Sequence, residues 1–169
     1  MPTTYQRYPI STVALANAVS LCIYAGGMLI FLQLELTFAI VYSAYCLWIE
    51  FRLLRGSCVN CYYYGGRCAF GRGRLCALLF PKGSAVKVAE HKITWKHLIP
   101  DFLVLLFPLL AGLISLIRGF NLSTLVAMVV ISTLSTAGNA FVRGSLACNH
   151  CVQRKMGCPA AQLFNVGAK

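Results

Sequence analysis

Four apolar segments, separated by short or long polar stretches, follow one another along the chain. They cover about residues 12–34, 36–54, 99–117 and 122–142. Each is close to the length of about 20 residues that a helix needs to cross about 30 Å of hydrocarbon. The backbone of a segment in lipid must also pair its polar groups internally. The pattern therefore predicts an all-α integral membrane protein with four transmembrane helices.

The connections between these segments are of two kinds. Gln33 and Glu35 are the polar residues between the first and second segments, and residues 118–121 join the third to the fourth. Connections this short predict two helical hairpins. Each hairpin is followed by a longer polar stretch, so both polar stretches are expected on one side of the membrane. The first segment is too long for the apolar core of a signal peptide, and we expect it to be retained.

The distribution of charge predicts which side this is. The short connections carry Arg118 and Glu35, whereas fourteen of the 15 lysines and arginines lie on the other side. Lysine and arginine are retained on the cytoplasmic side of a membrane. Both termini and both long polar stretches are therefore predicted to lie in the cytoplasm, with the helices in the cell membrane.

Composition narrows the expected partners. The chain is 59% hydrophobic and only 11% charged, whereas a soluble domain is roughly a quarter charged. Its net charge of +11 would suit nucleic acid, but nucleic-acid-binding proteins are seldom this apolar, so anionic lipid headgroups are the expected partner. The candidate residues of this lipid or anion interface are Arg55, Arg67, Arg72, Arg74, Arg143, Arg154 and Lys155. Tyrosines 62–64 are interpreted in the same way, as part of an interfacial loop.

The two long polar stretches share a pattern of residues. In each, Arg-Gly-Ser precedes three cysteines spaced C-x2-C-x6-C, and Leu-Phe-x-x-Gly follows them. The pattern predicts two parallel repeats, residues 1–83 and 98–169, each a hairpin followed by a cytoplasmic cysteine knuckle (residues 55–83 and 143–169). A pseudo-twofold axis along the membrane normal would bring the knuckles together. Residues 84–97, between the repeats, are predicted to form an amphipathic helix at the membrane surface.

The cysteines of the knuckles are candidate metal ligands. They are Cys58, Cys61, Cys68, Cys148, Cys151 and Cys158, with Cys76 and His150 as secondary candidates. A C-x2-C turn presents two thiolates to one ion, and two such turns complete a tetrahedral zinc site. Cys58, Cys61, Cys148 and Cys151 would share one zinc across the axis. Alternatively, each knuckle closes its own site, with Cys76 completing the first and His150 the second.

Other chemistry remains open for these thiols. An iron–sulfur cluster would accept them, although the familiar ferredoxin spacing is tighter. Disulfides or bare thiols are further alternatives, and a reducing cytosol disfavours the disulfides.

The sequence contains no recognisable set of catalytic residues. Three functions follow from the alternatives for the thiols. The first is a membrane-embedded scaffold whose knuckles bind zinc and dock a cytoplasmic protein partner, a second copy of the chain or lipid. The second is a membrane redox protein that transfers electrons through iron–sulfur or dithiol chemistry. The third is a small transporter or metal-trafficking protein.

Overall fold

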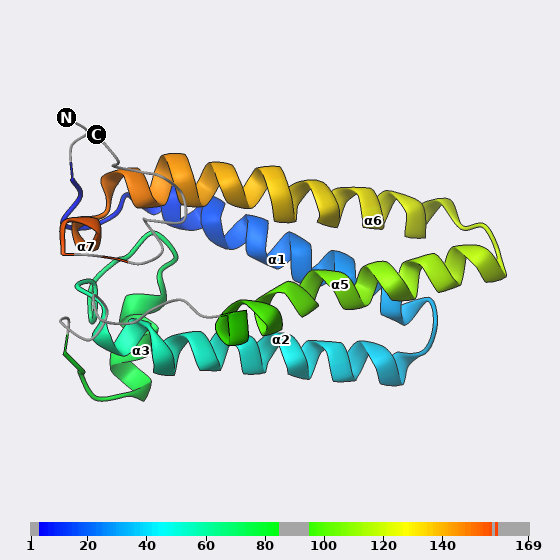
Figure 1. The fold of residues 1–169 in the computed structure, drawn as a ribbon, viewed down its shortest axis with the longest axis horizontal. Helices are drawn as coiled ribbons and strands as arrows, with labels where there is room; N and C mark the ends of the chain where they lie inside the picture. Colours follow the sequence, from blue (N-terminus) through cyan, green and yellow to red (C-terminus); the bar gives the residue numbers. More distant parts are fainter. Residues whose placement is uncertain (1–3, 85–94, 157, 159–169) are drawn as a thin grey trace. The chain divides into compact units, whose positions relative to one another are not determined.

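The computed structural model describes residues 4–84, 95–156 and 158. The chain is helical (Figure 1). Within these described residues, four helices are long and apolar enough to cross a membrane, as predicted, so this is an integral membrane protein. The principal helices are α1 (Ile10–Leu32), α2 (Leu36–Gly56), α3 (Arg72–Leu79), α5 (Trp95–Arg118), α6 (Leu122–Thr133) and α7 (Val152–Lys155). The predicted amphipathic helix over residues 84–97 falls mostly on residues 85–94, which lie outside the described part.

The chain divides into two compact units, each of which draws on both halves of the sequence. We call Ala18–Glu50 together with Trp95–Asn139 the helical unit. We call Met1–Asn17, Phe51–Thr94 and Ala140–Lys169 the cysteine unit, because seven of the 9 cysteines belong to it. The two predicted repeats follow one another along the sequence, whereas each compact unit draws on both. Compactness does not test whether the two halves arose by duplication, so the repeat stays a prediction.

The helical unit has a small core and a largely apolar surface. Ile30 of α1, Ala111 of α5 and Ile131 of α6 are buried against one another. Outside this core, large side chains are exposed, including Leu47 at 72% and Ile117 at 77%. Exposure of this kind is expected where lipid is the solvent, because lipid tails are as apolar as the side chains themselves.

Prolines interrupt the backbone hydrogen bonding of α5 without ending the helix, which runs from Trp95 to Arg118 through Pro100 and Pro108. A proline inside a helix leaves the carbonyl four residues earlier without its usual donor. For Pro108 that carbonyl belongs to Val104, and the hydroxyl of Tyr42 on α2 donates to it at 3.0 Å. The side chain of one membrane helix thereby satisfies a polar group that lipid could not.

Polar side chains join α1 to α6 near the short connections. Gln33 Nε2 donates to Ser123 Oγ at 2.9 Å, and the hydroxyl of Thr124, which is fully buried, donates to Gln33 Oε1. Asn121 caps the start of α6 by accepting a hydrogen bond from the Ser123 N–H. These contacts account for the sharp start of the fourth span.

The fourth span is longer and less regular than the single helix predicted over 122–142. It continues to His150, and after Thr133 it contains two π-helical stretches, Leu134–Gly138 and Phe141–Ala147. The hydroxyls of Thr133 and Thr136 donate to carbonyls one turn earlier, at 2.8 Å each. Such bonds compete with the regular helical ladder and favour local widening.

Candidate functional site

The two C-x2-C segments fold into the same kind of turn. Each forms a short 3-10 helix, Cys58–Asn60 and Cys148–His150, that begins at its first cysteine. In each turn the N–H of the second cysteine donates to the carbonyl of the first, at 3.2 Å for Cys61 and 3.3 Å for Cys151. Both second cysteines are extended, with φ/ψ of −78°/148° and −81°/126°. The matched sequences therefore adopt matched local structures.

Backbone N–H groups lie close to the sulfur of the second cysteine in both turns. The N–H of Tyr63 is hydrogen-bonded to the Cys61 sulfur. The N–H groups of Gln153 and Arg154, at the start of α7, are hydrogen-bonded to the Cys151 sulfur. A hydrogen bond donated to sulfur stabilises the thiolate relative to the thiol. These hydrogen bonds therefore lower the pKa of the second cysteine in each turn and oppose the effect of burial.

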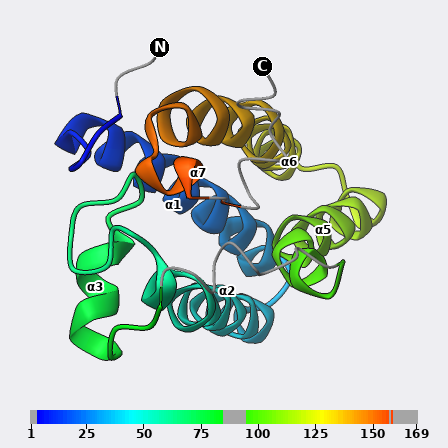
Figure 2. The same cartoon turned by 60° about the vertical axis from the view of Figure 1, so that its left-hand side comes forward.

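Hydrogen bonds join the two turns, and the ribbon shows the loop that leads into α3 beside α7 (Figure 2). The N–H of Tyr62, next to Cys61, donates to Gln153 Oε1 at 2.8 Å. The N–H of Val152, next to Cys151, donates to the hydroxyl oxygen of Tyr63 at 3.0 Å. The cysteine unit therefore brings together two turns that lie far apart in the sequence.

The N-terminal segment is hydrogen-bonded to both turns. The N–H of Tyr5 donates to the His150 carbonyl at 3.0 Å, and the Tyr5 carbonyl accepts from the Tyr63 hydroxyl at 2.6 Å. Tyr8, which is 1% exposed, donates its hydroxyl to the Ala147 carbonyl at 2.5 Å, while its N–H donates to the Arg67 carbonyl at 3.1 Å. Residues before the first membrane helix thus connect the two cysteine segments.

Three of the candidate ligands pack against one buried cluster. Cys61, Cys68 and Cys151 contact a core whose buried members are Tyr8, Tyr63, Ala69 and Ala147. All nine cysteines are free thiols. Within residues 4–84, 95–156 and 158, no group of three or more histidine, cysteine, aspartate or glutamate side chains is arranged to hold a metal ion. The thiols gather in one unit, and their side chains would have to reorient to share an ion.

Burial governs the acidity of these thiols. The pKa of Cys61 is raised to about 11, chiefly by burial and further by nearby Cys151, Cys68 and Cys158, while the hydrogen bond from the Tyr63 N–H lowers it in part. Burial also raises the pKa of Cys151 and of Cys76. At neutral pH these thiols are protonated, so a metal ion that binds them must displace their protons.

The secondary candidates are engaged in other contacts. Cys76 is fully buried in α3, and its thiol is 3.6 Å from the Leu54 carbonyl, to which it donates. The His150 ring is stacked on Tyr5, with ring centroids 4.7 Å apart. Each residue thus has a packing role in the cysteine unit that does not depend on a metal.

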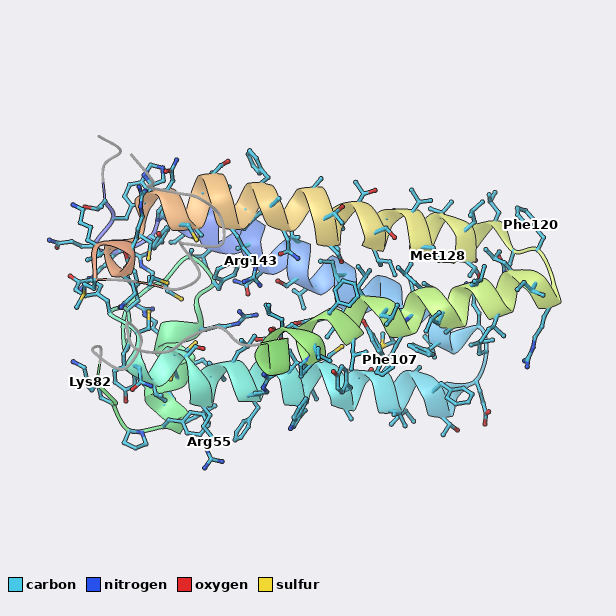
Figure 3. The ribbon with its side chains drawn as sticks, viewed as in Figure 1. Arg55, Lys82, Phe107, Phe120, Met128 and Arg143 are labelled. Carbon is cyan, nitrogen blue, oxygen red and sulfur yellow. The ribbon has the colours of Figure 1, made fainter. Side chains whose placement is uncertain are left out.

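The predicted anion-interface residues differ in their surroundings. Arg55 and Arg143 are exposed, as is Lys82, and the Arg55 side chain projects away from the ribbon of α2 (Figure 3). The guanidinium groups of Arg72 and Arg143 both lie over Phe70, at 5.4 and 5.2 Å from the ring centroid. Arg74 and Lys155 are exposed, whereas Arg67, Arg72 and Arg154 are half-buried.

Sequence patterns did not identify the residues that hold the turns together. An interfacial position was predicted for tyrosines 62–64, and this is wrong for Tyr63, which is only 4% exposed. The hydroxyl of Tyr64 donates to the Phe80 carbonyl at 2.6 Å, while Tyr62 is exposed. Gln153 is also buried, at 2% exposure, and the sequence pattern did not predict a role for it. Its one sequence signal is its position, two residues after a C-x2-C cysteine.

An open groove of about 710 Å³ lies between α1 and α6 within the helical unit. Its lining is almost wholly apolar and consists of Cys22, Ala25, Gly26, Leu29, Leu122, Ser123, Val126, Ala127 and Val130. An apolar lining suits an acyl chain or a helix and does not provide a path for an ion.

Comparison with known proteins finds no matching family model, no matching characterised protein and no matching solved structure.

Proposed function

We propose that this protein is a membrane-embedded metal-binding scaffold in which the cysteines of two duplicated knuckles bind zinc on the cytoplasmic face. The observation that supports it most is the pair of matched C-x2-C turns joined by hydrogen bonds through Tyr62, Tyr63 and Gln153. Two C-x2-C turns side by side are the usual source of four thiolates for a structural zinc ion.

The contact between the turns favours one shared site over two separate sites. Cys61 and Cys151 pack against the same buried cluster, together with Cys68. Cys61 also lies near enough to Cys151 for the Cys151 thiol to raise the pKa of Cys61. Ligands from both turns would therefore complete one tetrahedron, and the remaining thiols would stay protonated or stabilise the shell around it.

Zinc would supply the free energy that draws the thiols together. Each bound thiolate releases a proton, and the binding free energy of a structural zinc ion is largely folding free energy. The cysteine unit is already held by its tyrosine hydrogen bonds. We therefore expect zinc to tighten this unit rather than to fold it from a disordered state.

The cytoplasmic placement rests on charge. Thirteen of the 15 lysines and arginines belong to the cysteine unit, and two belong to the helical unit. Cations flanking membrane helices favour the cytoplasmic side and the anionic lipids found there. Reducing conditions on that side would keep the thiols available for a metal.

Metal analysis of anaerobically purified protein tests the proposal. We expect one zinc per chain in the wild-type protein, and a large loss of zinc in Cys58→Ser and in Cys148→Ser. Cys22→Ser is the matched control, because Cys22 is exposed on α1 in the helical unit, and it should keep its full zinc content.

Other outcomes of this experiment have defined meanings. Full metal content in both knuckle variants would refute the ligand assignment, and two zinc ions per chain would favour separate sites. If the purified protein is brown and contains iron and sulfide, the zinc proposal is refuted in favour of the electron-transfer function. Labelling of intact cells provides the second test: a thiol reagent that cannot cross membranes should leave the knuckle cysteines unmodified.

A further inference from the structure

Two buried side-chain N–H donors in the described part of the chain have no hydrogen-bond partner. They are the Nε of Arg67 and the Nε2 of Gln153. Both belong to residues next to candidate ligands, since Arg67 directly precedes Cys68 and Gln153 follows Cys151 by two residues. A buried donor without an acceptor costs free energy, so each such group calls for a physical explanation.

The orientation of the Gln153 amide follows from its partner. The N–H of Tyr62 is a donor, so the atom facing it at 2.8 Å must be the amide oxygen rather than the nitrogen. The NH2 group therefore points elsewhere. The main-chain N–H of Gln153 is bonded to the Cys151 sulfur, and Tyr62 is the neighbour of Cys61. The amide thus contacts the backbone next to Cys61 while belonging to the segment that follows Cys151.

The neighbouring cysteine thiols change character as hydrogen-bond acceptors when a metal binds. A protonated thiol is a weak acceptor, and no sulfur lies within hydrogen-bonding reach of either donor in the described residues. The thiols would approach these donors only as they reorient around a metal. A metal-bound thiolate carries negative charge and accepts charge-assisted hydrogen bonds, and four thiolates around Zn²⁺ leave a net charge of −2. Such a centre needs donors and positive charge around it, and the buried Gln153 and the half-buried Arg67 would supply them.

We infer that Gln153 and Arg67 are positioning residues for the metal centre, and that their free N–H groups donate to thiolate sulfurs when zinc is bound. This inference rests on the proposed zinc function. Gln153 would hold the two turns at the right separation through its oxygen and stabilise the bound thiolates through its nitrogen. Arg67 would offset part of the negative charge of the centre.

Gln153→Glu separates these two roles. The variant keeps an oxygen for the Tyr62 N–H but replaces the NH2 donor with a second oxygen, which repels thiolates. We expect zinc affinity, measured by competition with a chelator, to fall by about tenfold or more. The matched control is Gln6→Glu, which makes the same substitution at an exposed position of the same unit and should bind zinc as the wild type does.

A spectroscopic measurement distinguishes positioning from simple loss of structure. Co²⁺ bound in place of zinc gives sulfur-to-metal charge-transfer absorption. Loss of hydrogen bonds to the thiolates should move this absorption to lower energy. Gln153→Met, which removes the donor without adding charge, should show the shift while retaining the helical circular dichroism of the wild type. Arg67→Lys keeps the charge but loses Nε, and it should show a smaller shift.

The outcomes separate this inference from the proposed function. If the wild-type protein binds neither Zn²⁺ nor Co²⁺, the zinc function fails and this inference fails with it. If the wild-type protein binds metal while Gln153→Glu and Gln153→Met keep both its affinity and its absorption, the zinc function stands and the role of Gln153 is refuted.

Discussion

The cysteine unit and the helical unit are stabilised by different kinds of contact. In the cysteine unit, segments far apart in the sequence are joined by hydrogen bonds that involve Tyr5, Tyr8, Tyr63 and Gln153. In the helical unit, the backbone is satisfied within helices, and side chains intervene where Pro108 interrupts that pattern. The difference follows from the solvent. Regular helices in lipid pair their backbone N–H and C=O groups internally. Irregular backbone outside lipid needs a separate hydrogen-bond partner for each of these groups.

The comparison also shows why the two units differ in their tolerance of change. The helical unit exposes large apolar side chains to lipid, where one can replace another at little cost. The cysteine unit contains close backbone approaches and buried polar groups that admit few alternatives. We therefore expect the largest effects of single substitutions in the cysteine unit, and four predictions test that expectation, in order of decreasing effect.

Gly73→Ala should be the most damaging. Gly73, in α3, is packed so closely on backbone that an added Cβ would overlap the Tyr63 carbonyl oxygen and lie 2.6 Å from the Gly66 carbonyl oxygen. Backbone cannot move aside as a side chain can, so we expect a loss of about 3 kcal/mol in unfolding free energy in detergent micelles. Gly144→Ala is the control, because its Cβ would enter open space. Equal stabilities for the two variants would contradict the close packing.

Tyr63→Phe should weaken the cysteine unit by about 2 kcal/mol, because it leaves the Tyr5 carbonyl and the Val152 N–H without partners. Hydrogen exchange would show faster exchange at Val152 and unchanged exchange in α5. Tyr62→Phe removes a hydroxyl from the exposed neighbouring ring and should leave exchange at Val152 unaltered. Faster exchange throughout both units would contradict the separation drawn between them.

Tyr42→Phe should cost the helical unit about 1 kcal/mol, since the Val104 carbonyl loses its donor. Pro108→Ala restores a backbone N–H for that carbonyl. The Tyr42→Phe substitution should therefore be nearly neutral when Pro108→Ala is already present. A double-mutant cycle measures this coupling, and strict additivity would show that Tyr42 does not compensate for the proline.

High pH should destabilise the metal-free cysteine unit gradually. Burial raises the pKa of Cys61 to about 11 in the folded protein, from an ordinary value of 9.0. The unfolded chain therefore loses this proton first, and stability should fall as pH rises from about 9 to about 11. Denaturant titrations across this window measure the effect, which should be smaller in Cys61→Ser. An identical slope in the variant would assign the effect to other groups.

Much of the fold could be predicted from segment lengths. The four spans were predicted from apolar runs alone, and the structure confirms them, although the fourth extends to His150. Cys61, Cys68 and Cys151 pack against one buried cluster, which is consistent with the predicted approach of the two knuckles. The sequence pattern did not predict which residues contact one another. The tyrosine contacts could not be predicted, because a run of three tyrosines does not show which ring is buried.

The amino-acid sequence by itself determined that this chain inserts into a membrane through four helices. Hydrophobic length is a local property, and lipid leaves an apolar segment of that length one satisfactory backbone conformation. Tertiary structure alone decided that Tyr8, Tyr63 and Gln153 hold the cysteine turns together, and that Tyr42 serves the carbonyl freed by Pro108. Those partners lie tens of residues apart, and a hydrogen bond depends on where the folded chain brings its donor and acceptor.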